Sequence, residues 1–234
     1  MRKIPCFLLV AATILCLQGA PSSLLDTKLL AAAEHGDAGE ARSLLGSGAN
    51  PNAANTDGNT LTALMLASRG GHSSVVRILL AAGAKVEATA AVRVGVSGAN
   101  EGLTALMGAA ASGDTATVEL LLERKANPNA KSVFKTNSSS GGRAENFLPL
   151  IMNSANLAVL RTLAEHGADL HAKNGDGDSV LMYAAEHLDP PAVQYLLSKG
   201  LDPRERNNEG KTALDLAMEA GKADSVEILK KAVR

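Results

Sequence analysis

The chain has 234 residues, of which 46% are hydrophobic and 20% are charged, and its formal net charge at pH 7 is −1. These proportions are ordinary for a soluble globular protein. The near-zero net charge excludes a general nucleic-acid binder, which needs a basic surface. Only 2% of the residues are aromatic, and tryptophan is absent. Because large β-sheet cores usually rely on bulky side chains, this composition favours many thin helices packed through alanine and leucine.

The first residues are arranged like a secretory signal peptide. Two basic residues precede an apolar run over residues 4–17, which is shorter than the roughly 20 apolar residues of a membrane span. Small residues follow, so that cleavage after Ala20 or Ser22 is expected. We assign residues 1–22 to a signal peptide, with an uncleaved anchor and an ordinary first helix as the alternatives. The expected location is therefore periplasmic or secreted.

Cleavage would remove both cysteines, because Cys6 and Cys16 lie inside the predicted signal peptide. The exported chain would then hold no disulfide, no thiolate nucleophile and no cysteine-ligated metal. We expect residues 23–234 to form one domain, stabilised by packing, with no membrane segment.

The rest of the sequence repeats. Residue pairs that start with a leucine recur 33 to 42 residues apart; the second residue is apolar in all but the last pair, and a Gly-Ala-like step follows most of them. The first leucines of these pairs are Leu44, Leu79, Leu121, Leu163, Leu196 and Leu229. A Thr-Ala-Leu string begins upstream at Thr62, Thr104 and Thr212. The six copies cover approximately residues 26–56, 57–88, 89–130, 131–173, 174–206 and 207–234.

This pattern resembles the ankyrin repeat, which has a period of about 33 residues and the signature Thr-Pro-Leu-His-x-Ala. Residues 57–88 hold the copy most similar to it, and the resemblance extends from about Asp26 to the C-terminus. It implies an all-α solenoid of helix–turn–helix units joined by β-hairpin loops. No copy is large enough to bury its own apolar face, so stability comes from stacking.

Individual positions agree with this architecture. The threonines of the Thr-Ala-Leu strings stand where a first helix begins and can cap its free backbone N–H groups. A glycine follows several second helices, where a left-handed turn is needed. These glycines are Gly48, Gly83, Gly167 and Gly200.

Two copies exceed the period, and their surplus lies in hairpin insertions at residues 89–101 and 131–147. Residues 92–96 alternate apolar with small or charged side chains, which indicates an elongated β-hairpin. Residues 136–142 have the composition of a flexible polar loop. We expect both insertions to project side by side from one edge of the solenoid. Such loops often carry function, although length drift in a tolerant loop is the alternative.

Motifs for catalysis and metal binding are not found in the sequence. None of the five histidines belongs to a His-Glu-x-x-His string, and we expect them to form hydrogen bonds in turns. Lys211 and Thr212 follow a glycine as in a phosphate-binding loop, but Glu205 stands where its first glycine is required. The segment around Asp176 resembles a calcium loop, yet Ala185 replaces the closing glutamate. We expect no enzyme, no cofactor and no metal.

The resemblance instead implies protein binding through hairpin tips and the concave face of the first helices. The tip candidates are Asn59, Arg93, Asn100, Glu101, Leu103, Asp176, Asp178, Glu209 and Lys211. The concave-face candidates are Glu34, His35, Arg69, Ser112, Glu186, His187 and Glu219. Simple solvation is the alternative for each charged residue.

With its leader, the chain is similar to exported bacterial ankyrin proteins. The first hypothesis is a monomeric, non-catalytic scaffold that binds another protein, without nucleic-acid or membrane partners. The alternative is an inhibitor or immunity-type protein that blocks an enzyme or toxin with its hairpin insertions. A hidden enzyme, the third class, would need a convergent cluster of titratable side chains.

Overall fold

A computed structural model describes residues 24–233, apart from residue 57 and residues 95–97, 137–144, 148–156 and 188. The predicted signal peptide lies outside the described residues. So do most of the expected flexible loop over residues 136–142 and the segment where the first helix of the fourth copy is expected.

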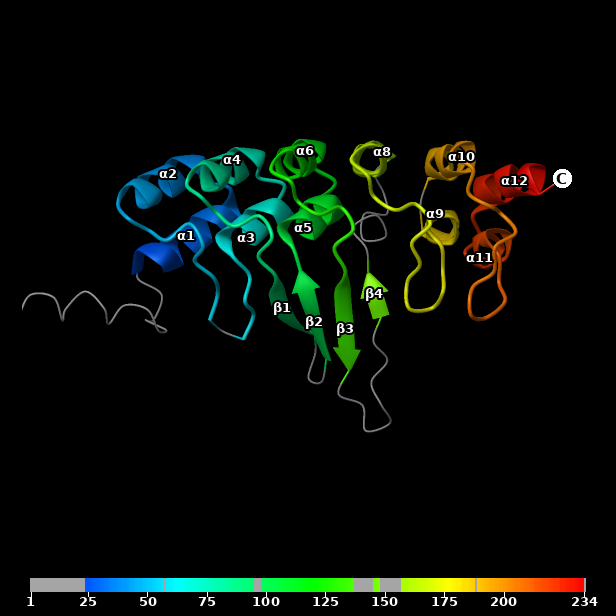
Figure 1. Ribbon diagram of the computed structural model, residues 1–234, viewed down its shortest axis with the longest axis horizontal. Coiled ribbons are helices and arrows are strands. Elements are labelled where there is room, and N and C mark those ends of the chain that lie inside the picture. The colour runs from blue at the N-terminus through cyan, green and yellow to red at the C-terminus, as the bar shows by residue number, and fades with distance from the viewer. Residues whose placement is uncertain are drawn as a thin grey trace, which may run out of the picture.

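The helices form two rows that run along the molecule (Figure 1). The first row holds α1 (Leu24–His35), α3 (Ala63–Arg69), α5 (Ala105–Ser112), α9 (Val180–His187) and α11 (Ala213–Glu219). The second row holds α2 (Ala38–Gly46), α4 (Ser73–Ala81), α6 (Thr115–Glu123), α8 (Leu157–Glu165), α10 (Pro190–Ser198) and α12 (Ala223–Ala232). Turns and strands extend from the side of the first row. The two rows of helices form the expected mostly helical solenoid.

One continuous core runs through the stack, because neighbouring helix pairs share it. The first leucine of every predicted pair is buried, and even the most exposed of the six, Leu44, has only 8% of its surface accessible. Small side chains such as Ala67 and Ala109 are fully buried on the first helices, where they let successive pairs approach closely. The predicted packing roles of leucine and alanine are confirmed.

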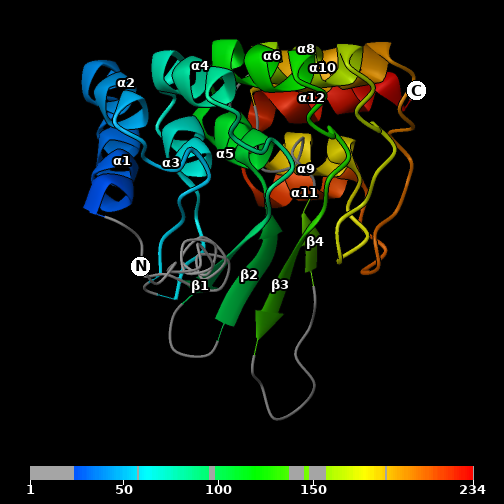
Figure 2. The ribbon, with the colours of Figure 1, turned by 60° about the vertical axis from the view of Figure 1, so that its left-hand side comes forward.

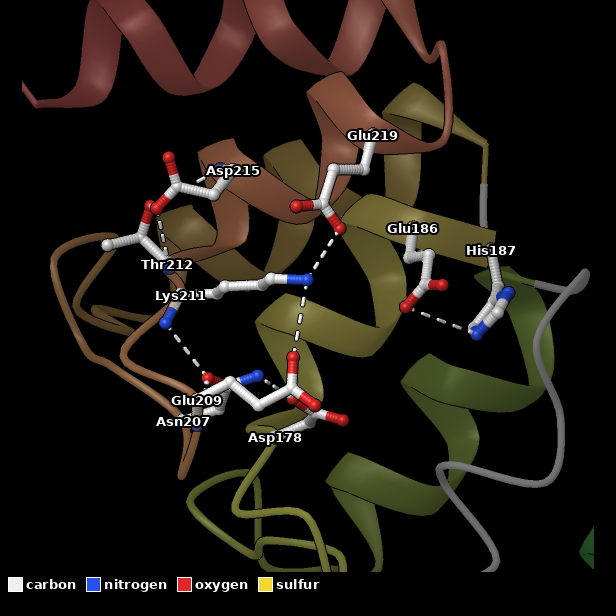
Figure 3. A network of polar contacts seen from close by, with 9 residues as sticks. All are labelled: Asp178, Glu186, His187, Asn207, Glu209, Lys211, Thr212, Asp215 and Glu219. Carbon is white, nitrogen blue, oxygen red and sulfur yellow. Dashed lines mark hydrogen bonds and ion pairs between the residues drawn. The ribbon is translucent and has the colours of Figure 1, made fainter.

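Three first helices begin with the predicted threonine caps. The hydroxyl oxygens of Thr62, Thr104 and Thr212 each accept a hydrogen bond from the backbone N–H three residues later, at 3.3 Å. In α11 the cap is reciprocal, because the Thr212 N–H and hydroxyl donate to Asp215 Oδ2 at 2.8 and 2.7 Å (Figure 3). These hydrogen bonds hold the pKa of the Asp215 carboxyl below its usual value.

The second helices end in left-handed turns. The four predicted glycines have φ between 86° and 94°, which confirms their role. In the third copy Lys125 takes this place with φ 66°, a conformation that L side chains rarely adopt.

Hydrogen bonds also cross between neighbouring copies. His72 Nε2 lies 3.0 Å from the Glu34 carbonyl oxygen, so this histidine links the first two copies. Asn52 Oδ1 accepts from the Lys85 N–H at 2.7 Å, and Asn129 Oδ1 accepts from the Asp169 N–H at the same distance. The turns are thereby fixed to one another as well as to the core.

The two insertions join into a single antiparallel sheet with strand order β1-β2-β3-β4 (Figure 2). Its strands are β1 (Ala90–Val94), β2 (Gly98–Leu103), β3 (Ser132–Thr136) and β4 (Glu145–Phe147). β2 pairs with β3 from Gly98↔Thr136 to Glu101↔Val133. The expected all-α class is therefore incomplete: consecutive insertions that lie side by side leave strand edges that can pair.

The second copy covers the outer edge of β1. The Ala91 N–H donates to Thr60 Oγ1 at 2.8 Å, and the Arg93 N–H donates to Asn59 Oδ1 at 3.0 Å. The sheet is thus fixed to the preceding hairpin turn at one edge.

Substitutions at the left-handed turns test how much the left-handed backbone conformation of Lys125 lowers the stability of the fold. We expect Lys125→Gly to raise the free energy of unfolding by about 0.5–1 kcal/mol, because glycine adopts this φ without steric conflict. Gly83→Ala is the matched control and should lower it by about 1 kcal/mol, since a Cβ there meets no atom within 4 Å and acts through the backbone alone. Urea unfolding followed by circular dichroism measures both, and equal signs for the two variants would contradict the assignment.

Asp215→Asn tests the reciprocal cap of α11. The lowered pKa means that the ionised carboxylate stabilises the fold above its ordinary pKa of 3.8 and that this contribution is lost as the pH falls through the lowered value. We expect the variant to be less stable at neutral pH by on the order of 0.5 kcal/mol, a small value because the side chain is exposed. The difference should shrink below pH 3.8 in urea unfolding. A difference that stays constant into acid would show that the charge plays no part.

Candidate functional site

The inner face is defined here as the C-terminal ends of the first helices together with the hairpin turn of residues 207–211, and the sheet lies beside it. At its N-terminal end Arg69 on α3 pairs with Glu34 on α1, with 3.6 Å between guanidinium nitrogen and carboxylate oxygen, and both side chains are more than half exposed. His35 Nδ1 lies 2.8 Å from the Ala31 carbonyl oxygen, and the Ser112 hydroxyl donates to the Ala109 carbonyl at 2.9 Å. These helix-end candidates therefore differ: Glu34 and Arg69 present charge, whereas His35 and Ser112 bond to their own helices.

The C-terminal end of the inner face is acidic (Figure 3). Lys211 Nζ lies 2.8 Å from Glu219 Oε2 and 3.2 Å from Glu209 Oε2. Hydrogen bonds to these two carboxylates raise the pKa of Lys211, and the bond to Glu219 has the larger effect. Glu186 Oε2 lies 3.5 Å from His187 Nε2. Lys211 is thus paired with two carboxylates, and Glu186 on α9 adds a third carboxylate to this end, so that acidic side chains outnumber the lysine.

Two candidates in the fifth hairpin turn also hold copies together. Asp178 accepts hydrogen bonds from Asn207 Nδ2 at 2.7 Å and from Asn174 Nδ2 at 3.1 Å. The Asp176 carbonyl oxygen accepts from the Asn208 N–H at 3.0 Å. Their carboxylate and backbone groups therefore position the neighbouring turn, and their contact with a partner stays a prediction.

Three residues expected at a hairpin tip lie within β2 instead. Asn100 pairs with Val92, while Glu101 and Leu103 lie still closer to the helices. The tip placement was wrong because the pairing of β1 with β2 continues beyond these residues as far as Val94↔Gly98. Arg93, near the far end of β1, is exposed, and its backbone is held by the hydrogen bond to Asn59.

Arg93 also packs over the preceding turn. A Cβ placed on Gly58 would lie 2.7 Å from Arg93 Cζ, so the guanidinium group occupies the space that the missing side chain leaves open. Asn59 and Arg93 thus lie together at the outer edge of the sheet.

A pocket of about 210 Å³ lies where α3 and α5 meet the sheet. Its lining is largely apolar, although Arg69, Asn100 and Thr104 also contribute to it. The apolar residues include Met65, Val92, Leu103 and Met107. Sequence reasoning missed the pocket and its two methionines. The available signal was Gly108, which stands where the second and sixth copies have Leu66 and Leu216.

Neither a metal site nor a membrane-spanning helix is found among the described residues. Among residues 24–233, outside the gaps named above, no group of three His, Cys, Asp or Glu side chains could hold a metal ion. No helix in the described part of the chain combines the length and apolar character needed to cross a membrane.

Curated relatives share the repeats over part of their length. An ankyrin repeat protein of Rickettsia bellii is 31% identical over 88 residues, which are 35% of this chain and 52% of that protein. An ankyrin repeat and LEM domain-containing protein 1 homolog of Caenorhabditis elegans is 33% identical over 72 residues, 31% of this chain and 10% of that protein. The chain thus spans about half of one relative and a tenth of the other.

A solved structure is similar over most of the chain. It is the Bd0816 predatory endopeptidase from Bdellovibrio bacteriovorus in complex with immunity protein Bd3460, and one of its chains matches with a TM-score of 0.68 and 26% sequence identity. The match covers 90% of this chain and 99% of that chain. A family model described as ankyrin repeats in three copies matches residues 29–132 and 150–233. These matches cover most of the sequence, and the chain belongs to the ankyrin-repeat family.

Proposed function

We propose that this chain is a non-catalytic binding protein that holds one partner protein against its inner face and four-stranded sheet. Repeat proteins of this kind use extended concave surfaces for binding. The observation that carries the proposal is the pairing of β2 with β3, which turns two separate insertions into one surface beside the first helices. Together the two surfaces can supply the roughly 800 Å² per partner that a stable interface needs.

The proposal extends to the organisation and location of the chain. Five described helix pairs, together with α8, are consistent with six copies. The basic and apolar leader supports export of a monomer that acts in the periplasm or outside the cell, after removal of residues 1–22.

A second candidate function is inhibition of an enzyme by an immunity-type protein. The observation that favours it is the likeness to a chain of the endopeptidase–immunity protein complex, because the match covers nearly all of that chain. Both candidates use the same inner face. They differ in their effect on the partner: a scaffold leaves the partner active, whereas an inhibitor blocks its activity.

Charge reversal on the two rows of helices tests which face binds. Arg69→Glu alters the inner face, whereas Arg77→Glu makes the same change on the exposed side of α4 in the second row. With the partner captured from an envelope fraction, we expect Arg69→Glu to weaken binding about tenfold or more in titration calorimetry. The Arg77→Glu control should bind as tightly as the unchanged protein.

A variant without residues 92–100 and 132–144 tests the sheet in the same assay. Loss of binding with retained helical circular dichroism would support the role of the sheet. Unchanged binding by this variant, or equal losses for the two arginine variants, would contradict the proposed surface.

An activity assay separates the two candidates. If the chain is an inhibitor, one equivalent should reduce the endopeptidase activity of its captured partner at least about tenfold, since a bound inner face would cover the active site. Arg69→Glu should restore that activity in proportion to its weaker binding. A complex that forms with full partner activity would reject the inhibitor and leave the scaffold.

A further inference from the structure

A groove lies between α2 and α4, which are neighbours in the second row of helices (Figure 1). Its volume is about 460 Å³, and none of its lining residues belongs to the first row or to the sheet. Leu45 and Ile78 are only partly buried, so apolar surface faces solvent there. The lining, which is largely apolar, consists of Arg42, Leu45, Arg77, Ile78, Ala81 and Ala82.

The first two copies differ from the other four beside this groove. The difference lies in the second and third residues after the first leucine of each predicted pair, which are Gly46-Ser47 and Ala81-Ala82 in these two copies. Each of the other copies carries a charged residue there, namely Glu123, Glu165, Lys199 and Lys231. Long charged side chains can cover apolar helix surface. Small residues at these positions therefore leave the groove uncovered.

Two positive charges accompany the apolar lining. Arg42 and Arg77 occupy equivalent positions, two residues before the first leucine of their pairs. Both side chains are exposed, and within the described ranges neither forms an ion pair with another residue of the chain. A guanidinium group binds a carboxylate through two parallel hydrogen bonds. An occupant with carboxylates beside its apolar side chains is therefore complementary to the groove.

The backbone beside the groove favours a helix as its occupant. The N–H and C=O groups inside α2 and α4 bond within their own helices, so an extended segment would find no backbone partners along the groove. A helix satisfies its own backbone groups and can place an apolar stripe between two other helices. The groove is also open to solvent at Ala81 and Ala82, whereas a small-molecule site encloses most of its ligand.

We infer that the α2–α4 groove binds an acidic amphipathic helix of a second protein. The apolar side chains of this helix lie in the groove, and its carboxylates pair with Arg42 and Arg77. Because the lining residues lie outside the inner face, the helix and the inner-face partner can bind at the same time. The chain would thus bridge two proteins, which goes beyond the proposed function and does not depend on it.

Three synthetic peptides test the groove, each about 18 residues long because shorter isolated helices are marginal in water. The first has leucines at positions i, i+3, i+4 and i+7 with glutamates on both sides of this stripe. Lysines replace the glutamates in the second, and alanines replace the leucines in the third. We expect the glutamate peptide to shift the methyl NMR signals of Leu45 and Ile78 but not that of the exposed Met218. The other two should bind at least about tenfold more weakly.

Two pairs of variants locate the effect. Ala81→Glu introduces the residue type that the third and fourth copies carry at this position, so the fold should be retained while the glutamate peptide binds about tenfold more weakly. Ser198→Glu places the same charge at the equivalent position of α10 and should change nothing. Arg77→Glu should weaken the glutamate peptide and strengthen the lysine peptide. Arg161→Glu, at the equivalent position of α8, should do neither.

The outcomes separate this groove from the inner face. Equal affinities of the glutamate and lysine peptides overturn the inference, as do absent shifts at Leu45 and Ile78. Dodecanoate that gives the same shifts with higher affinity than the peptide also overturns it, because the groove would then take a small amphiphile. Arg69→Glu should leave peptide binding unchanged. If the peptide binds but no partner holds to the inner face, the proposed function fails and the inference stands; the reverse result refutes the inference alone.

Discussion

No helix pair of this chain can bury its apolar face alone, and the rest of the structure depends on that constraint. The first leucine of each pair is buried because neighbouring helices pack over it. Stacking in turn brings successive turns within hydrogen-bond distance, as between Asn52 and Lys85 or Asn129 and Asp169. The sheet follows from the same constraint, since adjacent copies with long insertions place β2 and β3 at the distance at which strands pair.

Position-by-position features could be predicted from the sequence because their causes are local. A threonine before an apolar helix caps it wherever the helix lies, and Gly83 adopts its left-handed turn without help from distant residues. The packing leucines were equally predictable, because each repeats at one place in the period. These local rules were sufficient to predict the repeated helical architecture.

Features that join separate copies could not be predicted in this way. The register of β2 against β3 depends on how far two insertions extend, so Asn100 and Glu101 were expected at a tip and lie in a strand. The pocket depends on the close approach of α5 to α3, where a Cβ on Gly108 would lie 3.3 Å from the Arg69 backbone nitrogen, and no motif encodes this approach. Sequence comparison between copies could have drawn attention to Gly108, although not to the sheet that closes the pocket.

The charged residues of the proposed inner face would act on a partner before contact is made. The C-terminal end of this face carries Glu186, Glu209 and Glu219 against Lys211, and such exposed charges act mainly on the rate and orientation of association. Charges of this kind are screened by salt beyond roughly 8–10 Å and bind weakly by themselves. A partner with a basic surface would thus be oriented by this region and retained by contacts elsewhere on the inner face.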